Sequence, residues 1–219
     1  KEKNEYEYDI VVIDNSSSDN TVEIVKENGV AVVSHCVNTG SGFGTVTTYF
    51  SYACKMDYDI LCQFDGDGQH IAAELSKIIK PVISDNADYV IGSRYIMKEG
   101  FQSSLLRRIG IRFFAKILSS LVGVKITDST SGFKAYSKRF IRFMALNYRH
   151  EIYDSNHLIM LAGLNNMKIV EVPVKMRARQ FGISEYNFVN SILYPIRGII
   201  NIIGLRLQFR NIHKKNNSD

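Results

Sequence analysis

Short apolar segments alternate with helix-like segments through the first half of this 219-residue chain, and this alternation constrains the fold more than any other feature. Apolar runs of this length, bounded by turn residues, are typical of strands in a sheet. The expected strands are residues 9–14, 30–35, 60–64 and 89–93, and the expected helices are about residues 21–28, 40–56 and 71–84. Consecutive strand–helix–strand units predict a doubly wound α/β domain with a mostly parallel sheet.

The second half has a different pattern. Residues 103–122 are expected to form an amphipathic helix, in which Arg108, Arg112 and Lys116 share one stripe because they recur every four residues. The apolar face of this helix is expected to consist of Phe113, Phe114, Ile117 and Leu118. A helix at 154–163 and a strand at 168–174 are expected to follow. Residues 188–207 are rich in Ile and Leu but contain Arg, Asn and Pro, which favours an interfacial helix over a membrane span.

The charge is distributed unevenly along the chain. Residues 1–100 carry 8 basic and 16 acidic side chains, whereas residues 101–219 carry 19 basic and 6 acidic side chains. The basic half is therefore expected to face an anionic partner, for which nucleic acid, phosphates and an anionic membrane surface all qualify. The three cysteines have no metal-ligand spacing, and their odd number favours a reducing, intracellular setting.

Acidic residues follow the expected strands at the end where ligands bind in open α/β sheets. Asp14 ends the first strand, and the segment Asp65-Gly66-Asp67-Gly68-Gln69-His70 directly follows the third. Carboxylate oxygens suit a hard divalent cation that also holds substrate phosphates, so Asp65 and Asp67 predict a metal–diphosphate site. His70 is a candidate third ligand, although it also suits a buried polar position at the start of the next helix.

The glycine-rich segment 38–44 opens a helix, and backbone N–H groups at a helix N-terminus are suited to bind phosphate. The segment is neither a Walker A loop nor a dinucleotide-binding fingerprint, because the residues that define those motifs are missing.

The order of these motifs resembles that of the family 2 inverting glycosyltransferases of the GT-A fold, and most closely the branch of dolichyl-phosphate mannose synthase and bacterial polyprenyl-phosphate sugar transferases. The motifs that carry the resemblance are residues 12–21, 38–42, 65–70, 91–95, 128–136, 170–174 and 179–184. The family usually opens with a strand ending in a Pro-x-Tyr-Asn-Glu-like segment, which is missing here, so a preceding strand is expected to lie outside this sequence. Asn15 stands where the family usually has a second Asp.

The resemblance implies a role for each matching residue. The residues expected to bind the nucleotide-sugar are Asp14, Asn15, Gly40, Asp65, Gly66, Asp67, Arg94, Arg179 and Ser184. Asp65, Asp67 and His70 are expected to hold Mg²⁺ or Mn²⁺, and Arg179 and Ser184 to close over the diphosphate. Asp128 and Asp154 are the candidate catalytic bases beside the acceptor. The GT-A domain is expected to span residues 1–185, and residues 186–219 to form a basic, amphipathic segment at a membrane or an oligomer contact.

The acceptor remains open at this point. A polyprenyl phosphate is already an anion and needs only positioning, whereas a glycan hydroxyl needs a carboxylate base. The basic stripe and amphipathic C-terminal segment favour a lipid-linked acceptor, and hence a hexosyltransferase of cell-envelope glycan synthesis at the cytoplasmic face of the membrane. The alternatives are a soluble polysaccharide glycosyltransferase, a nucleotidyltransferase, and a non-catalytic nucleotide- or nucleic-acid-binding module. No aromatic–basic motif for nucleic acid supports the last of these.

Overall fold

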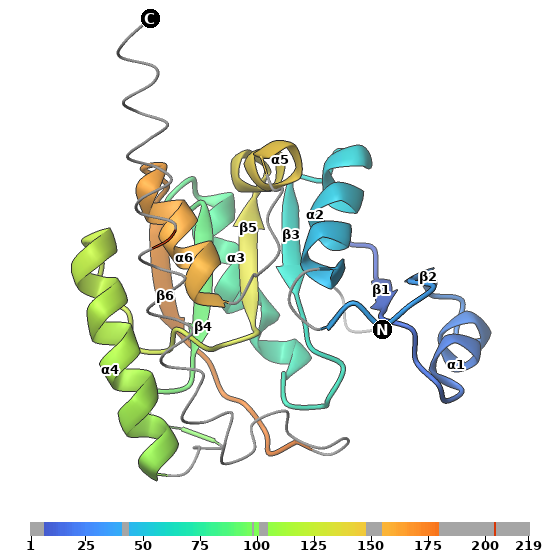
Figure 1. The fold of residues 1–219 in the computed structure, drawn as a ribbon, viewed down its shortest axis with the longest axis horizontal. Helices are drawn as coiled ribbons and strands as arrows, with labels where there is room; N and C mark the ends of the chain where they lie inside the picture. The colour runs from blue at the N-terminus through green and yellow to red at the C-terminus, as the bar shows by residue number, and fades with distance from the viewer. Residues whose placement is uncertain are drawn as a thin grey trace, which may run out of the picture.

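The computed structural model describes residues 7–40, 44–97, 99–100, 105–147 and 155–179, together with Gly204. The described helices and strands are β1 (Val11–Asp14), α1 (Thr21–Glu27), β2 (Ala31–Ser34), α2 (Thr45–Lys55), β3 (Ile60–Gln63), the 3₁₀ turn η2 (Ala72–Glu74), α3 (Leu75–Ile83), β4 (Tyr89–Ser93), α4 (Leu105–Val122), β5 (Lys134–Ser137), α5 (Lys138–Asn147), α6 (Ser155–Leu164) and β6 (Ile169–Pro173). Figure 1 shows helices packed around these strands. The α/β prediction is confirmed.

The described strands form two sheets. β1 and β2 pair in parallel, and the larger sheet has the order β3-β5-β4-β6. β5 runs antiparallel to both β3 and β4, while β4 and β6 are parallel. The expectation of a mostly parallel sheet therefore holds for only part of the molecule. Sequence reasoning missed β5 and α5, because the four residues of β5 include a lysine and show no apolar run.

The reversed direction of β5 has a consequence for the site. An antiparallel strand begins at the edge where its parallel neighbours end. Gln63 at the end of β3 pairs with Lys134 at the start of β5, and Ile91 of β4 pairs with the same residue. The residues before β5 are thereby brought to the same edge as the residues that follow β3 and β4.

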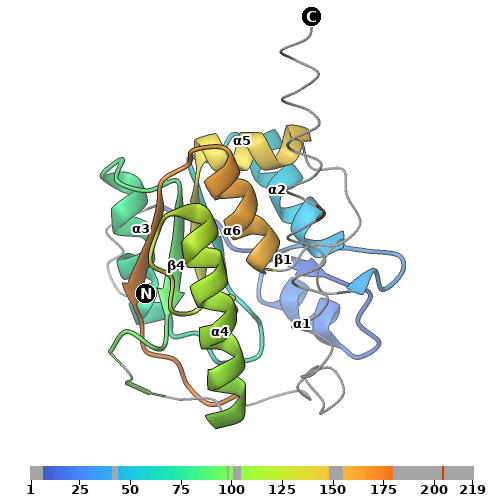
Figure 2. The ribbon, with the colours of Figure 1, turned by 60° about the vertical axis from the view of Figure 1, so that its left-hand side comes forward.

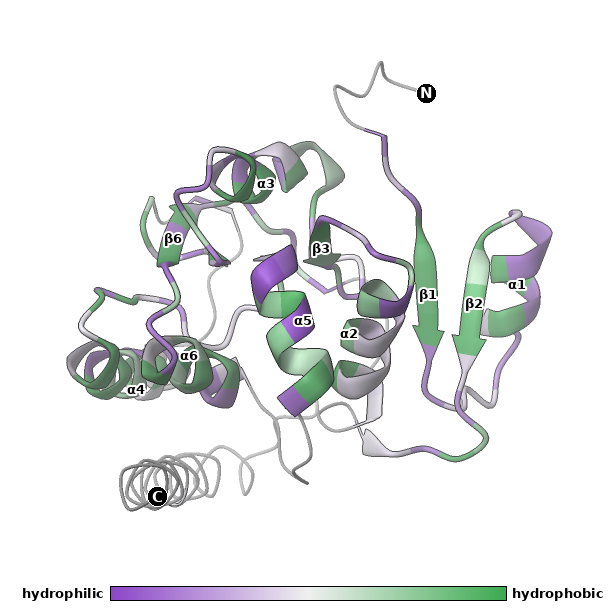
Figure 3. Cartoon of the chain, turned by 90° about the horizontal axis from the view of Figure 1, so that it is seen from above, coloured by the Kyte–Doolittle hydropathy of each residue, from purple (hydrophilic) through white to green (hydrophobic). Residues whose placement is uncertain are grey.

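The two sheets are linked through α2 and through one polar contact. α2 packs on α5 and also touches β1, and the Tyr58 hydroxyl donates a hydrogen bond to Asp9. In the described part of the chain, β1 pairs with β2 alone and β3 with β5 alone. Figure 3 shows the apolar strands β1 and β2 with α1 beside them. The strand expected to precede β1 remains a prediction.

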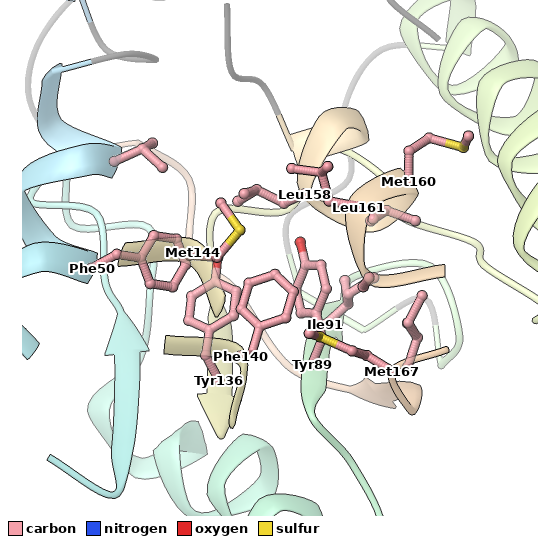
Figure 4. Packing of buried hydrophobic residues seen from close by; sticks show 14 of the residues in the cluster. Phe50, Tyr89, Ile91, Tyr136, Phe140, Met144, Leu158, Met160, Leu161 and Met167 are labelled. Carbon is pink, nitrogen blue, oxygen red and sulfur yellow. The ribbon is translucent and has the colours of Figure 1, made fainter. Parts of the chain in front are cut away.

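The main core lies between the larger sheet and the helices α2, α4, α5 and α6. Tyr89, Tyr136 and Phe140 are fully buried there, and the Tyr136 and Phe140 rings stack with their centroids 5.2 Å apart. Figure 4 shows Phe50 of α2 and Leu158 of α6 reaching the same cluster. Burying such aromatic side chains stabilises the fold by roughly 2–3 kcal/mol each, so this core holds the larger sheet rigidly under the site.

The buried face of α4 differs from the expected one. Ile111, Phe114, Ala115 and Leu118 are buried, whereas Phe113 is 57% exposed. Phe114 and Leu118 were predicted correctly, but Phe113 instead joins Arg112 and Lys116 on the exposed face. Phe113 lies four residues after Ile109, which is also exposed, and the helical period of 3.6 residues puts both side chains on one face. One surface of α4 thus combines cationic and apolar side chains.

Candidate active site

The segment Asp65–His70 leaves β3 as a tight loop at the edge where β3, β4 and β6 end. Gly68 has φ = +76°, a conformation that favours glycine, whereas a Cβ on Gly66 would meet nothing within 4 Å. The Gln69 backbone N–H donates to Asp67 Oδ1 at 3.0 Å. The Asp65 side chain is 46% exposed and the Asp67 side chain 16% exposed. The Asp67 carboxylate is therefore tied into the loop, and the Asp65 carboxylate is open to a ligand.

His70 lies beneath this loop. Its Nδ1 accepts a hydrogen bond of 2.9 Å from the Asp65 backbone N–H, and its Nε2 lies 3.9 Å from Asp65 Oδ2. The ring is buried, and burial lowers the pKa of His70 below its ordinary value.

The segment before β5 forms one wall beside Asp65. A Cβ on Gly132 would lie 2.0 Å from Asp65 Oδ2, so the carboxylate packs directly on the glycine backbone. The Phe133 ring stacks on the His70 ring with centroids 4.8 Å apart. Sequence reasoning placed residues 128–133 near the acceptor but did not predict this contact with the carboxylate, since it depends on the antiparallel direction of β5.

A segment from the far end of the described chain completes the cluster. Arg179 Nη2 lies 3.1 Å from Asp67 Oδ2. The preceding residues hold this segment in place, because the Arg177 N–H donates to the Gln69 carbonyl and Met176 bridges both His70 and Gly100. We call residues 174–179 the strap. The structure thus brings together Asp65, Asp67 and Arg179, which the sequence assigned to one diphosphate site.

Asp128 is not placed to act as a base. It is fully buried, and both of its oxygens are bound by Arg94, with Nε to Oδ2 at 2.7 Å and Nη2 to Oδ1 at 2.8 Å. Its backbone N–H and that of Thr127 donate to Glu171 on β6. Arg94, expected at the nucleotide-sugar, is likewise buried in this pair. The pair shapes the loop before β5, which is a structural role that motif order did not reveal.

The loops after β1 and β2 are joined by Asn15. Its Oδ1 accepts hydrogen bonds from the Thr39 N–H at 3.0 Å and the Thr39 hydroxyl at 2.9 Å, and its Nδ2 donates to Asn38 Oδ1. Asn38 Oδ1 also accepts from the N–H of Gly40, whose φ is +78°. Asn15 and Gly40 are thus linked through Asn38, and the Asn15 side chain is occupied in holding the glycine-rich loop.

The Asp14 side chain is buried and binds the loop that follows β1. The Ser17 N–H donates to Asp14 Oδ1 at 3.1 Å, and hydrogen bonds from the Ser17 side chain lower the pKa of Asp14. A role of Asp14 in nucleoside binding therefore stays a prediction. Asp154, Ser184 and the segment 186–219 lie outside the described residues.

The donor atoms fit a divalent cation that is shared with a substrate. Among the described residues, no group of three His, Cys, Asp or Glu side chains is arranged to hold a metal ion, so His70 does not complete a cage with Asp65 and Asp67. The reason is that its ring is packed under the loop. Mg²⁺ is commonly held by one or two carboxylates together with substrate phosphates and water, and two carboxylates meet that requirement.

Comparison with protein families gives a match to the glycosyl transferase family 2 model over residues 1–144. The chain belongs to glycosyl transferase family 2. It is therefore a glycosyltransferase, which agrees with the resemblance seen in its motifs. Family membership also sets aside the nucleotidyltransferase and the non-catalytic binding module.

Two named relatives are similar over most of their length. The UDP-N-acetylglucosamine–dolichyl-phosphate N-acetylglucosaminyltransferase of Methanococcus voltae is 32% identical, with 78% of this chain and 75% of that protein covered. The polyprenol monophosphomannose synthase of Mycolicibacterium smegmatis is 30% identical, with 83% of this chain and 71% of that protein covered.

A solved structure confirms the GT-A fold. Glucosyl-3-phosphoglycerate synthase from Mycobacterium tuberculosis, crystallised with Mn²⁺, UDP and glucosyl-3-phosphoglycerate, superposes with a TM-score of 0.62 at 16% identity. The match covers 90% of this chain and 69% of that one.

Proposed function

We propose that this family 2 enzyme is a metal-dependent, inverting hexosyltransferase that moves a sugar from a nucleotide-sugar to a polyprenyl phosphate in cell-envelope glycan synthesis. The observation that carries the proposal is the cluster of Asp65, Asp67 and Arg179 at the exit of β3. The carboxylates suit Mg²⁺ or Mn²⁺, and the arginine suits a diphosphate, so together they match the leaving group of a nucleotide-sugar. The Mn²⁺ and UDP named for the solved relative support this donor class.

The chemistry requires the leaving diphosphate to be stabilised. An acceptor phosphate oxygen attacks the anomeric carbon from the face opposite the diphosphate, and the bond from that carbon to the β-phosphate oxygen breaks. The electron pair departs with the nucleoside diphosphate, and the anomeric configuration inverts. A bound divalent cation supplies charge neutralisation on the diphosphate. Asp65 and Asp67 orient that group, and Arg179 donates hydrogen bonds to the developing charge.

Two observations favour a phosphate acceptor. Asp128 is closed off by Arg94, so this carboxylate cannot take a proton from a hydroxyl acceptor, and a phosphate acceptor needs no base. On α4, Nε of Arg108 is buried and has no hydrogen-bond acceptor among the described residues. A buried guanidinium donor without a partner is costly, which suits an anion that arrives with the substrate. The names of the two relatives include dolichyl phosphate and polyprenol.

A lipid acceptor implies contact with a membrane. No helix among the described residues is long and apolar enough to cross a bilayer. The exposed face of α4 carries Ile109, Arg112, Phe113 and Lys116, a combination suited to the surface of an anionic bilayer. We propose that the enzyme is a peripheral protein at the cytoplasmic face of the membrane.

The proposal is tested by transfer assays with purified protein. The chain is incubated with Mn²⁺, a polyprenyl phosphate, and labelled UDP-N-acetylglucosamine or GDP-mannose, and the glycolipid is isolated. We expect metal-dependent transfer that is abolished by Asp65→Ala and Asp67→Ala, with inversion shown by the anomeric NMR coupling. Equal transfer in EDTA would exclude the metal role, and retained configuration would exclude the inverting mechanism.

The second candidate acceptor is a glycan hydroxyl, as in a soluble polysaccharide glycosyltransferase. It is favoured if a mono- or oligosaccharide accepts the sugar and the polyprenyl phosphate does not. The Asp154→Asn variant separates the two candidates further, because a hydroxyl acceptor needs a base and a phosphate acceptor does not.

A further inference from the structure

His70 ends the acidic loop, yet its side chain is only 3% exposed. We propose that His70 is a positioning residue that fixes the Asp65 carboxylate for the metal and diphosphate, and that His70 is not itself a metal ligand. The inference rests on the proposed function, since it concerns the same cation. It assigns a role to a side chain whose sequence pattern allowed either a ligand or a buried polar residue.

The hydrogen bond between Asp65 and His70 determines which nitrogen of the His70 ring carries the proton. A backbone N–H can only donate, so Nδ1 of His70, which lies 2.9 Å from the Asp65 nitrogen, must be the acceptor. The Nδ1 lone pair is therefore occupied, and the proton of the neutral ring resides on Nε2. A ring that accepts a hydrogen bond at Nδ1 and carries a proton on Nε2 has no lone pair left for a metal ion. Ligation through Nε2 would require a proton on Nδ1 and the loss of the bond to Asp65.

Aromatic packing prevents the ring from turning to another orientation. Phe133 stacks on one face with an interplanar angle of 20°, and the edge-to-face contact with Phe64 has an angle of 88° and a centroid distance of 5.2 Å. Phe133 is fully buried, and the His70 backbone is bridged by Met176 of the strap. The ring is thus held by two aromatic contacts and its backbone by the strap, while its Nδ1 remains on the Asp65 N–H.

The Asp65 carboxylate is confined between His70 and Gly132. Oδ2 lies 3.9 Å from His70 Nε2, and the position of a Cβ on Gly132 would be 2.0 Å from the same oxygen. His70 holds the main chain of Asp65 through the hydrogen bond to Nδ1 and borders its carboxylate through Nε2, and the glycine leaves room for that carboxylate. Side chains that orient a metal ligand in this way typically change metal affinity by about 10–100-fold when they are replaced.

Two substitutions of His70 separate positioning from ligation. In His70→Asn the side-chain oxygen sits near the place of Nδ1 and can accept the Asp65 N–H, whereas in His70→Gln the amide reaches the place of Nε2. A positioning role predicts that the Asn variant keeps a Mn²⁺ affinity close to that of the unsubstituted chain and that the Gln variant loses about 10–100-fold. A ligand role predicts the opposite order. Binding is measured by EPR of free Mn²⁺, first alone and then with UDP.

Two more variants test the packing around His70 and Asp65, and their melting temperatures distinguish weaker Mn²⁺ binding from a loss of folding. His70→Phe keeps the stacked ring but removes the acceptor, so Mn²⁺ binding should weaken while the melting temperature changes less. Gly132→Ala places a methyl group against the flexible end of Asp65, which can move without disturbing the backbone. We expect Gly132→Ala to keep its melting temperature and to lose Mn²⁺ affinity. Equal Mn²⁺ affinity in Gly132→Ala and the unsubstituted chain would overturn the confinement of Asp65.

The outcomes also separate this inference from the proposed function. Binding of Mn²⁺ by the unsubstituted chain, with the Gln variant stronger than the Asn variant, overturns the positioning role alone. A chain that binds no Mn²⁺, with or without UDP, overturns the metal site and with it this role of His70. Mn²⁺ binding in the expected order, combined with no transfer to any acceptor, supports the positioning role and contradicts only the proposed reaction.

Discussion

At the scale of single residues, the same type of side chain serves opposite purposes in this protein. Asp65 is half exposed, whereas Asp128 is fully buried and bound on both oxygens by Arg94. Motif order placed both carboxylates near the reaction. Burial and partners, which depend on tertiary structure, leave Asp65 available to a ligand and make Asp128 part of the framework.

The buried pair predicts a large loss of stability when one partner is removed. In Asp128→Asn the Arg94 guanidinium would keep its charge but lose its carboxylate, which typically costs about 3–5 kcal/mol in the free energy of unfolding. Urea denaturation monitored by circular dichroism measures this loss. The double variant Arg94→Met with Asp128→Leu is the control, and it should recover part of the stability because no buried charge remains unpaired.

A different result would reassign Asp128. If Asp128→Asn unfolds at the same urea concentration as the unsubstituted chain but transfers sugar much more slowly, then Asp128 acts in the chemical step. The structural role inferred for Asp128 from its pairing with Arg94 would then be wrong.

At the scale of elements, the strap brings a segment from far along the chain to the Asp65–His70 loop. Arg179 forms an ion pair with Asp67, the carboxylate expected to hold the cation. A cation and a guanidinium that share one carboxylate compete for it. Arg177 lies two residues earlier, is exposed, and makes no ion pair within the described part of the chain.

We therefore predict that Arg179→Met binds Mn²⁺ alone more tightly than the unsubstituted chain, by up to about fivefold, the effect expected of a partly exposed ion pair. Binding of UDP with Mn²⁺ should weaken in the same variant, because the diphosphate loses a donor. Isothermal titration calorimetry measures both. Arg177→Met is the matched control, since it removes the same charge from the same segment; an equal gain in that variant would show that net charge, and not the ion pair, sets the affinity.

At the scale of the whole molecule, the start of α4 lies at the same edge of the larger sheet as the candidate site. Figures 1 and 2 show α4 beginning at the edge where β3 and β6 end, and the exposed side of this helix carries Arg112 and Lys116. In Figure 1, α4 lies beside the β6 edge of the larger sheet, whereas α1 and α2 lie beyond its β3 edge. Contact of α4 with a membrane would therefore bring the site edge close to a lipid-borne acceptor.

This arrangement predicts binding to anionic vesicles. The double variant Arg112→Glu with Lys116→Glu should bind phosphatidylglycerol vesicles at least about tenfold more weakly, because each basic side chain near such a surface contributes about 1 kcal/mol. Co-sedimentation measures the binding. Lys26→Glu with Lys55→Glu carries the same charge change on exposed positions of α1 and α2. If both double variants lose binding equally, the membrane does not recognise the α4 face.

The sequence by itself determined most elements and the composition of the site. β4 spans the predicted residues, and the other predicted elements of the described chain agree within a few residues at their ends, because apolar periodicity and turn residues are local signals. The Asp65–His70 loop was found at the end of β3 for the same reason. The family was recognisable because its motifs occur in a fixed order along the chain.

Only the tertiary structure decided what the site residues touch. The antiparallel direction of β5 brings Gly132 against Asp65, and the strap carries Arg179 to Asp67 across more than a hundred residues of sequence. Sequence periodicity reports which face of an element is buried, but it carries no information on pairing between distant segments. For that reason the sequence identified His70 as a candidate metal ligand, and the fold turned its Nδ1 to the Asp65 backbone.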